Sequence, residues 1–161
     1  MFLIFVGCKL ENRTVQEKTA EIPQWVYKLY EFQNERGEFQ KVYFFKQLND
    51  SVSYCVFTKS EGFSCSTSYV VTHINKKEFQ KTAIANKCDI DYSLIKNTYS
   101  LYKVLKPNII KSINYTSTVP DSLITDNGEI KRGIDLLNIE REIDSTFQFY
   151  KVSRKGKIVK K

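Results

Sequence analysis

The sequence predicts an α+β fold in which an antiparallel β-meander carries most of the core. Residues 25–74 alternate apolar and polar side chains at a period of two, as half-buried strands do. Asn, Asp, Gly and Ser interrupt this alternation at short intervals, which is typical of hairpin turns. The second half mixes strand-like runs with helical spacing, so we expect one to three helices and C-terminal strands packed on the meander.

About four strands are expected in the meander. Aromatic and β-branched residues fill them, and turn-forming residues such as Asn34 to Gly37 separate them. The second strand has apolar residues on both faces, so we expect it in the middle of the sheet with each face covered. The expected strands are residues 25–32, 39–45, 52–57 and 63–74.

The segments after the meander are expected to mix helix and strand. Apolar spacing predicts a short helix over 76–85, and Asp126 followed by Glu129 has the spacing of a capping box that would open another helix. Residues 91–105 have apolar residues at helical spacing, which favours a helix, but their Tyr and Ser content leaves a strand open as the alternative. Further strands are expected at 109–115 and 147–152.

Length and composition predict one domain. The chain has 161 residues, of which 42% are apolar and 14% aromatic, so it can bury a core and is not a disordered chain. No apolar run approaches the ~20 residues that a transmembrane helix needs. A lone histidine and singly scattered glycines give no basis for a histidine-bound metal or a phosphate loop, so we expect no cofactor and no metal. We place the domain at residues 24–153.

The positive charge is concentrated at the C-terminal end. The formal net charge is +7, from 25 Lys and Arg against 18 Asp and Glu, but the last eleven residues hold six of the basic side chains and no acid. We interpret residues 154–161 as a basic tail that contacts anionic lipids or polymers, with a solubilising end as the alternative. The six residues are Lys151, Arg154, Lys155, Lys157, Lys160 and Lys161.

The N-terminal apolar run ends at Phe5-Val6-Gly7-Cys8 and gives way to polar residues. These four residues resemble the lipobox of bacterial lipoproteins. The resemblance implies that Cys8 carries the lipid anchor, that residues 1–7 are the remnant of a signal peptide, and that residues 8–23 are a polar tether. It also implies a place in the bacterial cell envelope, facing the periplasm or the surface from the outer membrane. The alternative is an N-terminal edge strand with a free cysteine.

The other cysteines leave several pairings open. Cys55 and Cys65 flank a turn, and a hairpin symmetric about Ser60 would place them opposite each other, where a cross-strand disulfide could form. A three-residue loop that ends at Gly62 would make them diagonal instead. Bonds from Cys88 to Cys65 or to Cys55, and three buried free thiols, stay open as alternatives.

Candidate catalytic residues are few. His73 could act as a base, but if residues 63–74 form one strand, Cys65 and His73 stand eight residues apart, about 27 Å, and form no dyad. We therefore expect His73 to be a buried or surface histidine. The acidic groups lack the spacing of a calcium loop and are interpreted as solvated faces or turns. These acidic residues are Glu140, Glu142, Asp144, Asp89 and Asp91.

Two surfaces could bind a ligand. Aromatic residues in the first two expected strands could stack on sugars or bases, although such a concentration is more often core. Lysine and tyrosine alternate irregularly between residues 96 and 111 and form a second, weakly basic candidate surface. Its residues are Lys96, Tyr99, Tyr102, Lys103, Lys106 and Lys111.

The sequence favours a lipid-anchored envelope protein that works by binding, without catalysis. Its partners would be the membrane, through Cys8, and a protein or an anionic envelope polymer. Nucleic acid is disfavoured because the body of the chain is nearly neutral and the lipobox resemblance places it in the envelope. Two alternatives stay open: a soluble inhibitor or immunity-type module that binds a protein, and an envelope hydrolase.

Overall fold

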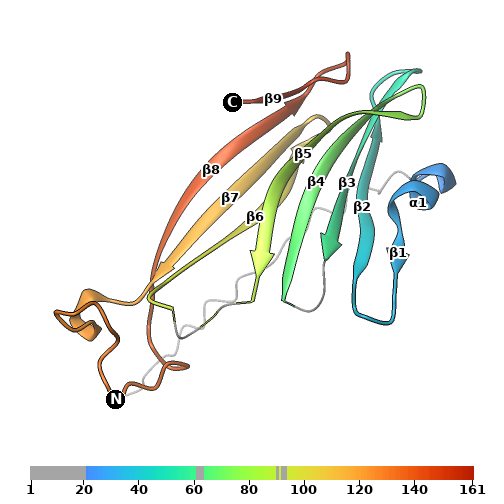
Figure 1. The fold of residues 1–161 in the computed structure, drawn as a ribbon. Helices are drawn as coiled ribbons and strands as arrows, with labels where there is room; N and C mark the ends of the chain where they lie inside the picture. Colours follow the sequence, from blue (N-terminus) through green and yellow to red (C-terminus); the bar gives the residue numbers. More distant parts are fainter. Residues whose placement is uncertain (1–20, 61–63, 90, 92–93) are drawn as a thin grey trace, which may run out of the picture.

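The computed structural model describes residues 21–60, 64–89, 91 and 94–161, and the structural statements below refer to these residues. Nearly all of the regular structure is antiparallel sheet, accompanied by one helix, α1 (Gln24–Tyr30), and one 3-10 turn, η1 (Asp121–Leu123) (Figure 1). The strands are β1 (Phe32–Gln33), β2 (Phe39–Gln47), β3 (Val52–Ser60), β4 (Cys65–Ile74), β5 (Lys77–Cys88), β6 (Lys96–Lys106), β7 (Ile109–Thr118), β8 (Glu142–Val152) and β9 (Ile158–Lys160).

The strands form two sheets. The first sheet has the order β1-β2-β3-β4-β5 and the second sheet has the order β6-β7-β8-β9. Every pair of neighbours is consecutive in the chain and antiparallel, so both sheets are meanders. The sheets lie close together at the upper end in Figure 1 and diverge toward the lower left. The expected antiparallel meander is confirmed, and the α+β class holds only in the sense that a sheet protein carries one short helix.

The predicted first strand is wrong, because residues 24–30 form α1. Pro23 stands directly before the helix with a φ of −61°, and Val26 and Tyr30, four residues apart, are buried on the helix face that packs on the first sheet. Tyr27 and Leu29 are exposed. The polar Lys28 lies between these two apolar residues, so apolar and polar side chains alternate here as they do in a strand.

The helices expected over 76–85 and after Asp126 are also wrong, and between residues 91 and 105 the alternative that was left open, a strand, is the one that forms. Residues 76–85 fall largely in β5, which pairs along its length with β4, and residues 91–105 contribute to β6, which pairs with β7. The capping-box spacing at Asp126 opens no helix. Gly128 and Gly133, at φ values of +76° and +80°, lie outside helical backbone geometry. The strands expected at 109–115 and 147–152 are confirmed within β7 and β8.

Two clusters of buried side chains form the core. The first lies between α1 and the first sheet and includes Val26, Tyr30, Val42, Phe45, Cys55, Phe57 and Val71. The second lies between the two sheets and includes Tyr54, Val56, Val70, Ile84, Ile110 and Val152. The expectation that β2 is covered on both faces is met, since Val42 and Phe45 pack in the first cluster and Phe44 packs on the second. The first sheet is therefore the middle layer, and the second sheet has one covered face.

Candidate functional site

The uncovered face of the second sheet is the candidate site. Alternate residues of β6, β7 and β8, including Tyr102, Ile110 and Tyr150, pack into the core between the sheets. Their neighbours in the chain point the other way, because side chains alternate across a strand. We call this other side the outer face. Its residues are Tyr99, Leu101, Lys103, Leu105, Ile109, Lys111, Ile113, Tyr115, Ile143, Phe147, Phe149, Lys151 and Val159.

Large apolar side chains are adjacent on the outer face, where the exposed Leu101 and Phe147 flank the half-buried Ile113. Leu101, Ile113 and Phe147 pair in register across three strands, and Phe147 is 62% exposed. The rings of Tyr99 and Tyr115 stack at 5.0 Å between centroids, which extends the apolar surface beyond the central row. A contiguous exposed apolar surface of this kind is typical of an interaction site.

Every charged side chain among the outward strand positions of the second sheet is a lysine. Lys103 lies directly opposite Lys111, and the Lys111 ammonium sits over the ring of Phe147, with Nζ 4.6 Å from the ring centroid. The acidic residues of β8, Glu142 and Asp144, fall on the opposite side of the sheet by alternation. Like charges directly opposite each other are unfavourable in a sheet, so this face is suited to an anionic partner.

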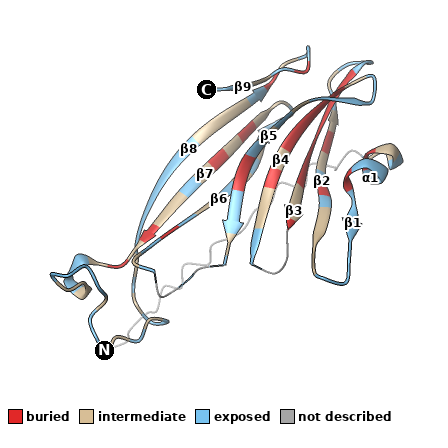
Figure 2. Cartoon of the chain, viewed as in Figure 1, coloured by how far each residue is buried: buried red, intermediate tan, exposed pale blue. Residues whose placement is uncertain are grey.

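In the half of the second sheet that extends past the first sheet, polar and apolar side chains have exchanged faces. There, the side that would continue the core carries exposed polar residues such as Asn114, Asp144 and Thr146. The apolar residues lie on the outer face instead. Figure 2 shows the corresponding half of β8 in the colour of exposed residues. Large apolar residues on this side of the half-sheet, among them Ile143 and Phe147, are exposed.

A pocket opens at one corner of the outer face, beside the β6–β7 turn and β9. Its volume is about 260 Å³, and its lining residues are Leu105, Lys106, Ile109, Phe149, Tyr150, Lys151 and Lys161. A larger, open hollow of about 490 Å³ lies near the other end of the sheet, between Leu94 and the loop around Ile130. The corner pocket combines apolar walls with three lysines among its lining residues.

Residues 154–161 are not the expected tail but a turn and a short strand, whereas Lys151 lies in a strand as expected. Lys151 belongs to β8, and residues 158–160 form β9 after a turn in which Gly156 adopts a φ of +80°. The Gly156 amide donates to the Ser153 carbonyl at 3.0 Å, which closes this turn. The hairpin brings Lys151 and Lys161 to the corner pocket, and Arg154, Lys155 and Lys157 lie in or beside the turn.

The predicted basic surface at residues 96–111 is split by the sheet. Tyr99, Lys103 and Lys111 lie on the outer face, whereas Tyr102 packs against the core between the sheets, where burial raises its pKa to about 12. Leu101, Ile113 and Phe147 are not among the residues that the sequence predicted for this surface. The signal that could have found them is the alternation Tyr99, Leu101, Lys103, Leu105, which appears only when this segment is interpreted as a strand.

His73 is part of a closed cluster that fastens α1 to the first sheet. Its side chain is fully buried, its Nε2 lies 2.9 Å from the Tyr30 hydroxyl, and the Tyr30 hydroxyl donates to Glu78 at 3.0 Å. Burial lowers the pKa of His73, although the nearby Glu78 carboxylate acts in the opposite direction. Burial also raises the pKa of the Cys55 thiol to about 12, so this thiol stays protonated. In this cluster the His73 imidazole and the Cys55 thiol are both buried.

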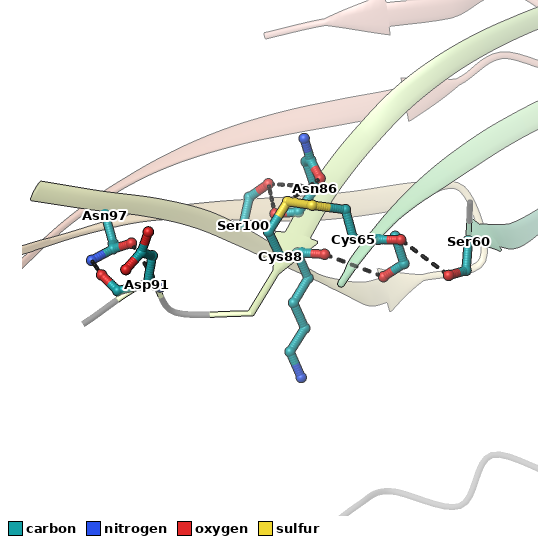
Figure 3. Close-up of a disulfide and its surroundings, with 9 residues drawn as sticks. Ser60, Cys65, Asn86, Cys88, Asp91, Asn97 and Ser100 are labelled. Carbon is teal, nitrogen blue, oxygen red and sulfur yellow. Dashed lines mark hydrogen bonds between the residues drawn. A yellow bond between two sulfur atoms is a disulfide. The ribbon is translucent and has the colours of Figure 1, made fainter. Parts of the chain in front are cut away.

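Of the cysteine pairings that the sequence left open, the structure contains Cys65–Cys88 and not Cys55–Cys65. Cys65 is bonded to Cys88 across β4 and β5, and Cys55 is a buried free thiol (Figure 3). The cause is the register of β3 and β4, which pairs Ser60 with Ser66 and places Cys55 opposite Val71. The disulfide closes the end of β5 beside Asn86, whose backbone is bonded to the Ser100 hydroxyl of β6 at 2.6 Å and 3.2 Å. Cys65 and His73 lie in the same strand, as expected.

The remaining candidates give no further site in the described residues. The acidic residues expected in solvated faces or turns, among them Glu140 and Asp89, belong to no group of three or more potential ligands that could hold a metal ion there. No helix in the described part of the chain is long and apolar enough to span a membrane. The predicted anchor Cys8 lies outside the described residues.

Comparisons with known proteins find no relative of this chain. No family model, no curated protein and no solved structure matches this chain.

Proposed function

We propose that this chain is a lipid-anchored envelope protein whose domain binds the anionic surface of a membrane through the outer face of the second sheet. One observation carries the proposal: an uncovered sheet face joins a row of exposed apolar residues to lysines, with no carboxylate among its strand positions. Apolar side chains enter the boundary between head groups and acyl chains, and lysines near an anionic surface each contribute about 1 kcal/mol.

The charge pattern favours an anionic surface over a second copy of the chain. A face-to-face dimer would bring Lys103 and Lys111 of one copy against the same lysines of the other, without a carboxylate on that face to pair with them. The lipobox resemblance at Cys8 supports a membrane in particular. An acyl anchor would hold the domain beside lipid head groups and raise their effective concentration at the outer face.

Replacing Lys103 and Lys111 by glutamine is expected to weaken binding to anionic vesicles by roughly 30-fold at low salt, because two lysines at about 1 kcal/mol each leave the surface. The full chain is used with Cys8→Ala as the background, so that no acyl group contributes. Cosedimentation with vesicles of phosphatidylcholine and phosphatidylglycerol measures the affinity, and vesicles of phosphatidylcholine alone show the dependence on lipid charge.

A matched control makes the same change of net charge on the first sheet. Lys77 and Lys87 are exposed residues of β5, and their replacement by glutamine is expected to leave vesicle binding nearly unchanged. An equal loss in the two variants would show attraction by net charge alone. If the parent chain does not bind anionic vesicles but binds an acidic protein, the proposed membrane binding is contradicted and a protein partner is supported.

The anchor has its own test, which does not depend on the sheet. In bacterial cells that express the full chain and grow with labelled palmitate, we expect label on the parent protein and none on Cys8→Ala. Cys55→Ala is the control, since the Cys55 thiol is buried and its loss should leave the label in place. A parent chain that carries no label would overturn the anchor.

A further inference from the structure

The corner pocket has walls of an unusual composition for a surface hollow. Its floor and sides come from Leu105 of β6, Ile109 of β7 and Phe149 of β8, which are residues of the outer face on three adjacent strands. The pairing of β6 with β7 shifts between Val104 and Lys106, so Leu105 is the extra residue of a β-bulge there. The bulge lets the Leu105 side chain line the pocket beside Ile109.

The size of the pocket limits what it can hold. Its volume of about 260 Å³ lies just under the ~300–1,000 Å³ of typical small-molecule sites. With walls formed almost wholly by aliphatic and aromatic carbon, it suits part of a single alkyl chain better than a polar sugar or a nucleotide. A polymer such as a polyanionic chain would need a basic track along the surface, which an apolar hollow does not provide.

The polar groups at the pocket define the other end of the ligand. Lys106, Lys151 and Lys161 all line it, and their side chains are exposed. Within the described residues, no carboxylate is paired with these ammonium groups. Lysines that contribute their apolar stems to a hollow and carry exposed ammonium groups match an anionic head group attached to a hydrocarbon chain.

We propose that the corner pocket binds one acyl chain of an anionic amphiphile, with the phosphate or carboxylate head group held by Lys106 and Lys151. The inference deepens the proposed function and rests on it, because it turns one corner of the membrane-binding face into a site for a single lipid molecule. Binding a single molecule needs no bilayer, so the two ideas can fail separately.

The test uses monomeric amphiphiles with the full chain carrying Cys8→Ala, and no vesicles. Dodecyl phosphate, titrated below the concentration at which it forms micelles, is expected to bind saturably with one site per chain in isothermal titration calorimetry. Dodecanoate tests whether a carboxylate serves as well as a phosphate. Inorganic phosphate and dodecyl maltoside, which each supply half of the required chemistry, are expected to compete poorly.

Variants assign the binding to the pocket. Lys106→Gln combined with Lys151→Gln is expected to weaken dodecyl phosphate binding by at least about tenfold, and Leu105→Ser to weaken it as well. Lys103→Gln combined with Lys111→Gln lies on the same face outside the pocket and should leave this binding intact. Unchanged urea unfolding midpoints show that the variants fold.

The outcomes are decisive in each direction. Absence of saturable binding by the parent chain, equal binding by the Lys106 and Lys151 variant, or equal competition by dodecyl maltoside would overturn the pocket. If the chain binds dodecyl phosphate but not vesicles, the pocket proposal is supported and the proposed binding to a membrane surface is contradicted. If vesicles bind but dodecyl phosphate does not, the proposed function stands without this site.

Discussion

Replacing Phe57 by alanine is expected to lower the free energy of unfolding by about 3–5 kcal/mol, the range for removing a buried aromatic side chain. Phe57 is fully buried in β3. Its ring stacks on Tyr30 of α1 at 4.8 Å and on Tyr69 of β4 at 5.3 Å between centroids. Removing it leaves a cavity at the point where helix and sheet meet, and rigid neighbours close such a cavity only in part.

Urea unfolding followed by the fluorescence of Trp25 measures this loss. Trp25 is the sole tryptophan of the chain and packs at the edge of the Phe45 and His73 rings, so its emission reports whether α1 stays docked. Phe147→Ala is the matched control, because Phe147 is 62% exposed and its loss should change stability by less than about 1 kcal/mol. Similar losses in the two variants would contradict the placement of the core.

Replacing Cys65 and Cys88 together by serine is expected to lower the free energy of unfolding by about 3 kcal/mol. The bond joins residues 23 positions apart, and a cross-link of this span restricts the unfolded chain. The loss should fray the end of the first sheet where β4 and β5 pair. Because the bond lies far from Trp25 in the chain, far-ultraviolet circular dichroism, which measures the loss of β-strand content, is the better probe of this change.

A reductant supplies the control for the disulfide. Dithiothreitol should destabilise the parent protein to nearly the same degree as the double substitution and leave the double variant unchanged. The remaining thiol, Cys55, is buried, and it should react with a thiol reagent only after unfolding. An unfolding midpoint of the parent protein that does not change on adding dithiothreitol would contradict the Cys65–Cys88 bond.

Local patterns in the sequence predicted the strands whose turns are also local. β2, β3 and β4 are runs of aromatic and β-branched residues between clear turn residues, so their existence and order follow from neighbours in the chain. The helix α1 was missed because the apolar Tyr27 and Leu29 lie on either side of the polar Lys28, which looks like the alternation of a strand. β5 was missed because a few apolar residues at helical spacing outweighed the backbone pairing that β4 offers.

The candidate site depended on information that no local pattern contains. The partner of Cys65 depends on the register of β3 with β4, and a shift of a few residues in one turn changes it. The sequence shows Lys103 and Lys111 close to Tyr102. It does not show that the Tyr102 side chain lies on the opposite face of the sheet, packed against the core. Whether Leu101 and Phe147 meet solvent depends on which elements cover the second sheet, and that is decided by distant parts of the chain.

The unbroken meander has a consequence for how the chain reaches this structure. Each strand pairs with the next one in sequence, so most contacts are between residues a hairpin apart, and contact order is low for a sheet protein. Closing the two sheets on each other is the distant step. It brings the Asn49 side chain to the carbonyl of Arg154, 105 residues away, at 2.9 Å. We expect the two sheets to form early and separately, and their closure to be the slow event that completes the core.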